Sequence, residues 1–168
     1  MNLAIFDLDN TLLAGDSDYL WGQYLVEQGR VDGPAYEAQN RKFYELYAAG
    51  TLDIAEFCAF SMKPLADNDP AQLYAWREQF VREKIVPIVA AGTPALLERH
   101  RAQGDTLLIT TATNRFIVEP IATLLGIPHR IATEPEMRDG RYTGRLAGLA
   151  SFQGGKVERL RQWREAQP

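Results

Sequence analysis

Two aspartates, Asp7 and Asp9, directly follow the apolar run Leu3 to Phe6 in the stretch LAIFDLDNTLLAGDS. Such a run is typical of a strand buried on both faces, as in a parallel sheet under helices. Open α/β sheets bind their ligands at the carboxyl ends of the strands. Two carboxylates this close repel each other, so a cation or a shared proton must hold them. The pair therefore predicts a cation site; the alternative is a strand-ending turn in which Thr11 caps the next helix.

Two further polar groups stand where a strand ends or a helix begins. Thr110, Thr111 and Asn114 follow the apolar residues of DTLLITTATNRF, and Lys156 follows two glycines. Hydroxyls before a helix N-terminus suit an anion, because backbone N–H groups there lack partners, and a lysine adds a point charge. Mg²⁺, which prefers oxygen ligands and brings phosphate with it, suits the aspartates. Together the groups predict phosphoryl transfer, although Thr111 alone also suits a helix cap and Lys156 a solvated helix start.

The remaining pattern predicts an α/β fold that brings these groups together. After the first strand, the helical pattern lasts about 75 residues, far more than a simple crossover between parallel strands needs. The elements expected next are a helix from Thr93, a strand at Thr106 to Thr110, a helix through Leu125, a strand at HRIAT, a hairpin turning near Asp139-Gly140 and a charged final helix. We therefore expect an α/β core formed by residues 1–15 and 92–168, with residues 16–91 inserted as an all-helical cap. The crevice between strand ends and cap is the expected site.

Length and composition limit the classes of protein. The 168 residues suit one domain or a core with one insertion, and the net charge of −4 without a basic run argues against nucleic-acid binding. The single cysteine, Cys58, cannot form an intramolecular disulfide. No apolar window reaches the ~18 residues of a membrane-spanning helix, and no export leader precedes the first strand. We expect a cytoplasmic protein without nucleic-acid or membrane partners, and its oligomeric state stays open.

Three motifs, in this order, resemble those of the haloacid-dehalogenase superfamily of phosphatases. DLDNT fits the DxDxT signature at the end of a first apolar strand, LLITTATNRF resembles the second motif, and GGK resembles the third. The helical insertion after the first motif is similar to subfamily IB, which includes phosphoserine phosphatases and bacterial histidinol-phosphate phosphatases. The resemblance covers essentially the whole chain. It implies a Rossmann-like core with a helical cap, and a Mg²⁺-dependent phosphatase acting on a small phosphorylated metabolite.

The resemblance also implies roles for individual residues. Asp7 would be the nucleophile that forms an aspartyl-phosphate intermediate. Asp9 would protonate the leaving alkoxide and then activate water. The Asp7 carboxylate and the Asp9 backbone carbonyl would hold Mg²⁺. Thr111, preferred to Thr110 from strand alternation and the family pattern, would bind phosphoryl oxygens together with Lys156.

The sequence departs from the superfamily at its fourth motif, a strand followed by Gly-Asp and a further carboxylate. That motif is expected after the lysine helix, and it does not occur before Pro168. Either the sequence lacks its C-terminal part or the protein is a degenerate member. We expect the former, because loss of that strand would expose the apolar edge of the first strand. With only Asp7 and Asp9 as ligands, weak Mg²⁺ binding and little activity are predicted for these 168 residues alone.

Substrate choice is expected to depend on the entrance to the cap. Asp16 lies nine residues after Asp7, where phosphoserine phosphatases carry a carboxylate that meets the substrate's amino group. The resemblance thus implies an amino-bearing substrate such as phosphoserine or histidinol phosphate, although Asp16 equally suits a helix cap. Thr11, Asn114 and Arg115 are further candidates for substrate binding.

Two alternatives to a phosphatase stay open: a phosphotransferase or mutase of the same fold, and a non-catalytic member that keeps the fold for binding. A response-regulator receiver is disfavoured, because its acceptor aspartate follows the third strand. A haloacid dehalogenase is disfavoured as well, because it has no role for a second aspartate two residues after the first.

Overall fold

A three-stranded parallel sheet with the order β1-β2-β3 forms the centre of the molecule, which a computed structural model describes for residues 2–167. A separate antiparallel hairpin follows the sheet in the chain. The strands are β1 (Leu3–Phe6), β2 (Thr106–Asn114), β3 (His129–Thr133), β4 (Pro135–Arg138) and β5 (Arg141–Leu146). Phe6 at the end of β1 lies opposite Ile109 of β2. The residues that follow Phe6 and Ile109 therefore meet at one edge of the sheet.

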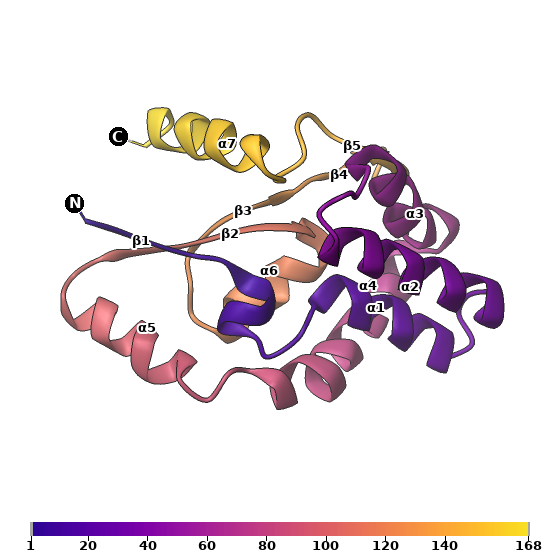
Figure 1. Cartoon of the computed structure of the whole chain (residues 1–168), viewed down its shortest axis with the longest axis horizontal. Coiled ribbons are helices and arrows are strands. Elements are labelled where there is room, and N and C mark those ends of the chain that lie inside the picture. The colour runs from indigo at the N-terminus through magenta and orange to yellow at the C-terminus, as the bar shows by residue number, and fades with distance from the viewer. Residues whose placement is uncertain (1, 168) are drawn as a thin grey trace.

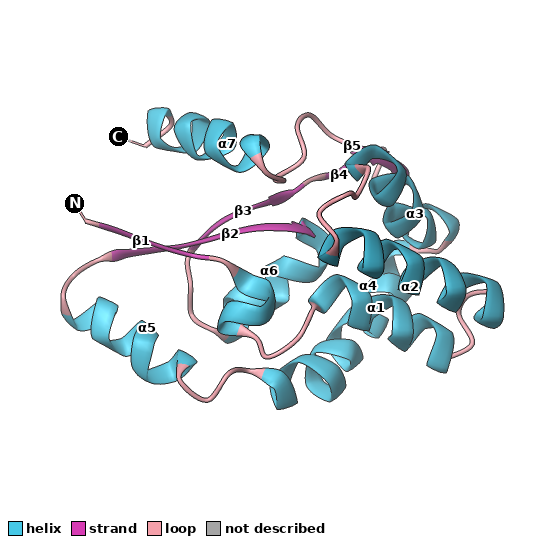
Figure 2. Ribbon diagram, viewed as in Figure 1, coloured by secondary structure: helices cyan, strands magenta, loops and turns pink. Residues whose placement is uncertain are grey.

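The helices surround the sheet on both faces and at its carboxyl edge. Within residues 2–167 they are α1 (Ser17–Glu27), α2 (Gly33–Ala48), α3 (Ile54–Asp67), α4 (Pro70–Phe80), α5 (Thr93–Ala102), α6 (Arg115–Leu124) and α7 (Gly154–Glu165). Figure 1 shows α7 on one side of the sheet, and α5 and α6 on the other. In Figure 2 the helices α1 to α4 gather beyond the ends of β1 and β2. In the described part of the chain, no helix combines the length and apolarity needed to cross a membrane.

Aromatic side chains join α1 and α4 to α6, which packs on the sheet. Trp21 of α1 lies edge-on to Phe80 at the end of α4 and to Phe116 of α6, with ring centroids 5.2 and 5.6 Å apart. All three rings are almost completely buried in one continuous apolar core. Aromatic pairs at these distances stabilise a core beyond the burial of their surface. These contacts therefore hold α1 against α4 and α6.

The predicted fold class, α/β with a parallel sheet and a helical cap, is confirmed. The predicted strands at Leu3–Phe6 and His129–Thr133 and the predicted turn at Asp139-Gly140 are confirmed as well. The second strand was predicted to end at Thr110 and instead continues through Asn114, with a register shift that lets Asn114 lie opposite Thr133. Threonines are good strand residues, because a branched side chain packs well on a pleated sheet. The helix predicted through Leu125 ends one residue earlier.

The hairpin of β4 and β5 packs on α3 rather than on the central sheet. A Cβ built on Gly144 of β5 would lie 3.2 Å from the Cβ of Ala66 in α3, and Figure 1 shows the two elements side by side. The division into a core of residues 1–15 and 92–168 and a cap of residues 16–91 stays a prediction. The hairpin links these two parts.

Candidate active site

The turn after β1 brings Asp9 back toward the start of α1. Asn10 takes a left-handed backbone conformation with φ of 54°, which asparagine tolerates better than most residues, and donates its N–H to the carbonyl oxygen of Gly15 at 3.0 Å. Ser17 then donates to Oδ1 of Asp9 twice, from its backbone N–H at 2.7 Å and from its hydroxyl at 2.6 Å. This short loop alone fixes one oxygen of Asp9.

The end of β2 fixes the other oxygen of Asp9. Thr113 donates its hydroxyl to Oδ2 at 2.7 Å, and Thr111 does so at 3.3 Å. Alternate residues of a strand share a face, so Thr111 and Thr113 point the same way. The hydroxyl of Thr110 is buried and has no hydrogen-bond partner among the described residues. The structure thus places Thr111, rather than Thr110, beside the aspartates.

Lys156 reaches the same edge of the sheet from the first turn of α7. Its ammonium lies 2.8 Å from Oδ1 of Asp7. A Cβ on the preceding residue, Gly155, would lie 2.2 Å from the carbonyl oxygen of Ala150. Only glycine therefore allows α7 to begin this close to the preceding loop, which explains the second glycine of GGK in physical terms.

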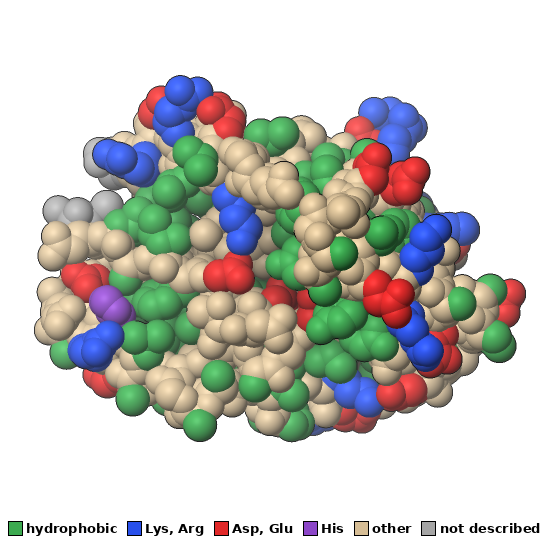
Figure 3. Space-filling view, in the orientation of Figure 1, with side chains coloured by type: hydrophobic (Ala, Val, Ile, Leu, Met, Phe, Trp, Pro, Cys, Tyr) green, Lys and Arg blue, Asp and Glu red, His purple; other side chains and the backbone are tan. Residues whose placement is uncertain are grey.

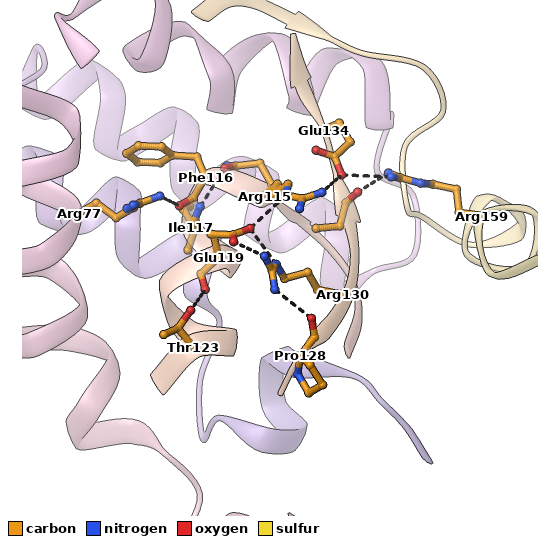
Figure 4. Close-up of polar contacts among 12 residues, drawn as sticks. Arg77, Arg115, Phe116, Ile117, Glu119, Thr123, Pro128, Arg130, Glu134 and Arg159 are labelled. Atoms are coloured by element: carbon orange, nitrogen blue, oxygen red, sulfur yellow. Dashed lines mark hydrogen bonds and ion pairs between the residues drawn. The ribbon is translucent and has the colours of Figure 1, made fainter. Parts of the chain in front are cut away.

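One turn further along α7, Arg159 anchors the helix to the rest of the core (Figure 4). Its guanidinium donates to the carbonyl oxygen of Ala132 at the end of β3 and, at 3.3 Å, to that of Leu149. It also donates to Oε1 of Glu134 at 3.3 Å. Because Arg159 and Lys156 lie on neighbouring turns of one helix, these bonds also hold the backbone that carries Lys156.

The hydrogen-bond network of Arg159 extends to α6 through Arg115, a residue predicted to bind substrate. Arg115 donates to Glu134 and to Glu119 at 3.1 Å each, and Arg130 donates to both oxygens of Glu119. Figure 4 shows Glu134 between Arg115 and Arg159. Arg115 lies outside the lining of the cavity at the strand ends, so its contact with substrate stays a prediction.

A cavity opens between the strand ends and the helices α1 to α3. Its polar end is formed by Asp7, Asp9, Thr111, Thr113 and Lys156. Its other end is formed by Asp16 and Asp18 from the start of α1, and by aromatic side chains, mostly from α1, α2 and α3. Figure 3 shows acidic and hydrophobic side chains next to each other in the middle of this face of the molecule.

The carboxyl groups of the cavity are held in a setting that disfavours their charge. Burial raises the pKa of Asp9, and the hydrogen bonds from Ser17 and Thr113 offset part of this rise. Burial, together with the negative charge of Asp9, raises the pKa of Asp16 to about 6. Burial and the charges of Asp16 and Asp9 hold the pKa of Asp18 well above its usual range. Positive charge entering this cavity would be favoured.

The structure brings together five of the predicted site residues: Asp7, Asp9, Asp16, Thr111 and Lys156 all line the cavity. The two interpretations of Asp16 are compatible, because it lines the cavity and also caps α1 by accepting the N–H of Tyr19 at 2.8 Å. Thr11 is exposed and lies outside the cavity lining. Asn114 is buried, caps α6 by accepting the N–H of Ile117, and does not line the cavity.

Three residues that contribute to the site were missed from the sequence: Ser17, Thr113 and Asp18. Strand alternation would have indicated Thr113 if the strand had been extended past Thr110. Ser17 and Asp18 carry no comparable pattern, because they resemble any polar start of a helix. Their place depends on how the turn at Asn10 folds back.

The haloacid dehalogenase-like hydrolase family matches residues 4–168 of the chain. A histidinol-phosphatase from Neisseria meningitidis is 45% identical over 163 residues, which is 96% of this chain and 73% of the relative. A phosphoserine phosphatase from Mycobacterium tuberculosis is 29% identical over 161 residues, which is 94% of this chain and 52% of the relative. The chain thus spans about half the length of this second relative.

Solved structures show the same fold. A protein of unknown function from Bordetella pertussis superposes with a TM-score of 0.90 at 44% identity, covering 96% of this chain and 73% of that one. A phosphoserine phosphatase solved as a phospho-aspartyl intermediate analogue superposes with a TM-score of 0.69 at 17% identity, covering 98% of this chain and 71% of that one. The second likeness is one of fold alone.

Proposed function

The chain belongs to the haloacid dehalogenase-like hydrolase family, and from this premise we propose that it is a phosphatase that hydrolyses a small phosphate monoester. One observation carries the proposal: the ion pair of Asp7 with Lys156 shares one end of a cavity with Asp9 and Thr111. A nucleophile, a proton donor and groups that bind an anion are what phosphoryl transfer needs. The relatives named histidinol-phosphatase and phosphoserine phosphatase support this class of reaction.

In the proposed reaction, Asp7 takes up the phosphoryl group. A carboxylate oxygen of Asp7 attacks phosphorus while the bond from phosphorus to the ester oxygen breaks, and the leaving alkoxide accepts a proton from Asp9. A water molecule then attacks the phosphorus of the aspartyl phosphate and gives a proton to Asp9. The bond from phosphorus to the oxygen of Asp7 breaks, inorganic phosphate leaves, and the Asp7 carboxylate is restored.

Asp9 suits the acid and base role because its surroundings can serve both protonation states. Its raised pKa favours a proton on the carboxyl group, as a general acid requires. The hydroxyls of Ser17 and Thr113 that now donate to it can each also accept a hydrogen bond. These two hydroxyls therefore hold Asp9 in place whether it is protonated or ionised.

Lys156 and Thr111 are proposed to bind the phosphoryl oxygens. The ammonium of Lys156, 2.8 Å from Asp7, reduces the repulsion between an anionic phosphate and an anionic nucleophile. A fixed positive charge in a partly buried site acts more strongly than one in water. Thr111 adds a hydroxyl donor from the buried end of β2.

The donor set at the end of β1 fits Mg²⁺. Proteins commonly hold this ion through one or two carboxylates, with phosphate and water completing the shell. Asp7, whose side chain is 40% exposed, offers carboxylate oxygens to the cavity, and the backbone carbonyl of Asp9 is the second proposed ligand. When bound, the ion supplies positive charge that stabilises the charge developing on the phosphoryl oxygens.

The proposal is tested by a screen of phosphate monoesters with the purified protein. The screen includes phenyl phosphate, phosphoserine and histidinol phosphate, each assayed for released phosphate with Mg²⁺ and with a chelator. We expect hydrolysis that depends on Mg²⁺ and is strongest for amino-bearing esters, because Asp16 lines the cavity. Release of phosphate from none of the esters, both by these 168 residues and by a chain extended at its C-terminus through the expected fourth motif, or equal release in the chelator, would contradict the proposal.

A further inference from the structure

The hydroxyl of Thr113 makes the shorter of the two hydrogen bonds to Oδ2 of Asp9. It lies 2.7 Å from this oxygen, whereas the hydroxyl of Thr111 lies 3.3 Å from it. Thr111 is also proposed to bind a phosphoryl oxygen, and a hydroxyl has a single proton to donate. When phosphate occupies the site, Thr113 is therefore the hydroxyl donor that remains for Oδ2 among the described residues.

The two oxygens of Asp9 differ in the donors that surround them. Oδ1 accepts the backbone N–H of Ser17 at 2.7 Å and the hydroxyl of Ser17 at 2.6 Å. An N–H group of the backbone can only donate, so the oxygen that faces it is held as an acceptor, as the carbonyl oxygen of a neutral carboxyl group is. The proton of neutral Asp9 therefore belongs on Oδ2, the oxygen beside Thr113. Oδ2 is thus the oxygen that would give its proton to the leaving group.

The position of Thr113 is fixed by the protein itself. Its side chain is 2% exposed, and its backbone N–H donates to the hydroxyl of Thr111 at 3.2 Å. The hydroxyl of Ser17 lies 3.4 Å from that of Thr113, but donates its own proton to Asp9. Asp18 also lies close; since its pKa is held well above the usual range, it does not compete as a carboxylate for the proton of Thr113. The hydroxyl of Thr113 is therefore available to Oδ2 before a substrate binds.

We propose that Thr113 is the positioning residue of the general acid, and that its hydroxyl directs Oδ2 of Asp9 toward the oxygen of the leaving group. The inference rests on the proposed phosphatase function and adds a residue to it. Oδ2 gives its proton to the ester oxygen while the bond from phosphorus to that oxygen breaks. The hydrogen bond from Thr113 then strengthens, because its acceptor becomes anionic. Without this hydroxyl, the contacts of Oδ1 alone do not stop the carboxyl group of Asp9 from rotating.

Two aryl esters separate this role from a general loss of activity. Phenyl phosphate has a leaving group that needs a proton, whereas para-nitrophenyl phosphate has one that is stable as an anion. We propose to measure kcat/KM for both, because this quantity reports the steps up to the departure of the leaving group. The protein is the 168-residue chain or, where that chain releases no phosphate, the chain extended through the expected fourth motif.

Two pairs of side chains at position 113 differ by the hydroxyl. Valine has the shape of threonine and alanine that of serine, so Thr113→Val is compared with the wild type, and Thr113→Ala with Thr113→Ser. The second pair carries the test if Thr113→Val does not fold. The control is Thr110→Val in the same strand, because the hydroxyl of Thr110 is also buried and has no hydrogen-bond partner among the described residues.

Loss of the hydroxyl should lower kcat/KM by about tenfold or more for phenyl phosphate, and by about threefold at most for para-nitrophenyl phosphate, in both pairs. Thr110→Val should match the wild type for both esters. Inhibition by inorganic phosphate should stay as in the wild type, because the proposal gives Thr113 no contact with phosphate. Equal losses for the two esters, no loss for either, or weaker inhibition by phosphate would overturn the proposal.

A measurement without turnover keeps the proposal testable if the proposed function fails. Release of phosphate from neither ester by either chain would contradict the phosphatase proposal alone. The orientation of Asp9 is then followed by NMR through the backbone N–H of Ser17, which donates to Oδ1. Thr113→Val should shift the resonance of this proton and speed its exchange with solvent, and Thr110→Val should change neither. An unchanged Ser17 resonance in Thr113→Val would overturn the proposal.

Discussion

The two ends of the cavity are built differently. At the end near the sheet, Asp9 accepts four hydrogen bonds, from Ser17, Thr113 and Thr111, and Asp7 is paired with Lys156. At the start of α1, Asp18 accepts a long hydrogen bond, at 3.3 Å, from the amide of Asn114, and the hydroxyl of Thr113 also lies close to it. The rings of Tyr44 and Tyr47, at the end near α1 to α3, are 41% and 43% exposed. One end is thus organised before any ligand arrives, as catalysis of charge transfer requires, whereas the tyrosines of the other end are partly exposed.

The largest effect is expected from Asp7→Asn, which removes the nucleophile. Loss of a covalent nucleophile costs several orders of magnitude in rate, so kcat should fall at least about a thousandfold for every ester alike. Because the Asp7 side chain is 40% exposed, the fold should be kept, which circular dichroism and the thermal midpoint check. More than a tenth of the wild-type rate in this variant would show that Asp7 is not the nucleophile.

A smaller effect is expected from Arg159→Met, which removes the anchor of α7 and keeps an apolar side chain of similar length. Lys156 should then be held less well, so that kcat/KM falls about tenfold for all esters and inhibition by inorganic phosphate weakens. Arg159→Lys should restore part of both. The matched control is Arg161→Met on the same helix, where the arginine is 67% exposed and paired with Glu158.

These kinetics are best measured at low temperature, where we expect both arginine variants to be folded. A structural role alone would lower the thermal midpoint of Arg159→Met and leave its phosphate inhibition as in the wild type. That outcome would show that the hydrogen-bond network in Figure 4 stabilises the fold but does not position Lys156.

The smallest effect is expected from Asp16→Asn. It is measured as the free energy of unfolding at a series of pH values, without metal or substrate. Since the pKa of Asp16 is raised to about 6, the folded chain holds a proton between about pH 4 and pH 6 that the unfolded chain has lost. The free energy of unfolding therefore falls as the pH rises through this window. Asparagine carries no charge and can still accept the N–H of Tyr19.

Asp16→Asn should therefore raise the free energy of unfolding at pH 7.5 by up to about 2 kcal/mol, a value reduced for the partial exposure of the side chain. Below pH 4 the variant and the wild type should be equally stable. A variant less stable than the wild type at pH 7.5 would show that the charge of Asp16 is compensated in the folded chain.

The sequence was most informative for the sheet end of the cavity. The two aspartates follow the apolar run Leu3 to Phe6, Thr111 follows the apolar part of the second strand, and Lys156 follows two glycines at the start of the charged final helix. The topology of a parallel sheet then brings their side chains together, whatever the detailed packing. This is why residues almost 150 positions apart could be assigned to one site.

The helical end could not be predicted to the same depth. Asp18 and Ser17 differ in no visible way from other polar residues at helix starts, such as Asp53 and Asp69, which cap their helices outside the site. Their position over the strand ends depends on the left-handed turn at Asn10 and on the packing of Trp21. Such tertiary contacts cannot be predicted from the periodicity of apolar residues in the sequence.

The central claim, that Asp7 receives the phosphoryl group, is tested most directly by trapping the intermediate. The protein is mixed with excess phenyl phosphate and Mg²⁺, quenched in acid within the first turnovers, digested and examined by mass spectrometry. The account predicts a phosphorylated peptide that contains Asp7, in proportion to an initial burst of phenol, and its absence in Asp7→Asn. Turnover with no phosphorylated peptide, or a phosphoryl group on another residue, would contradict it.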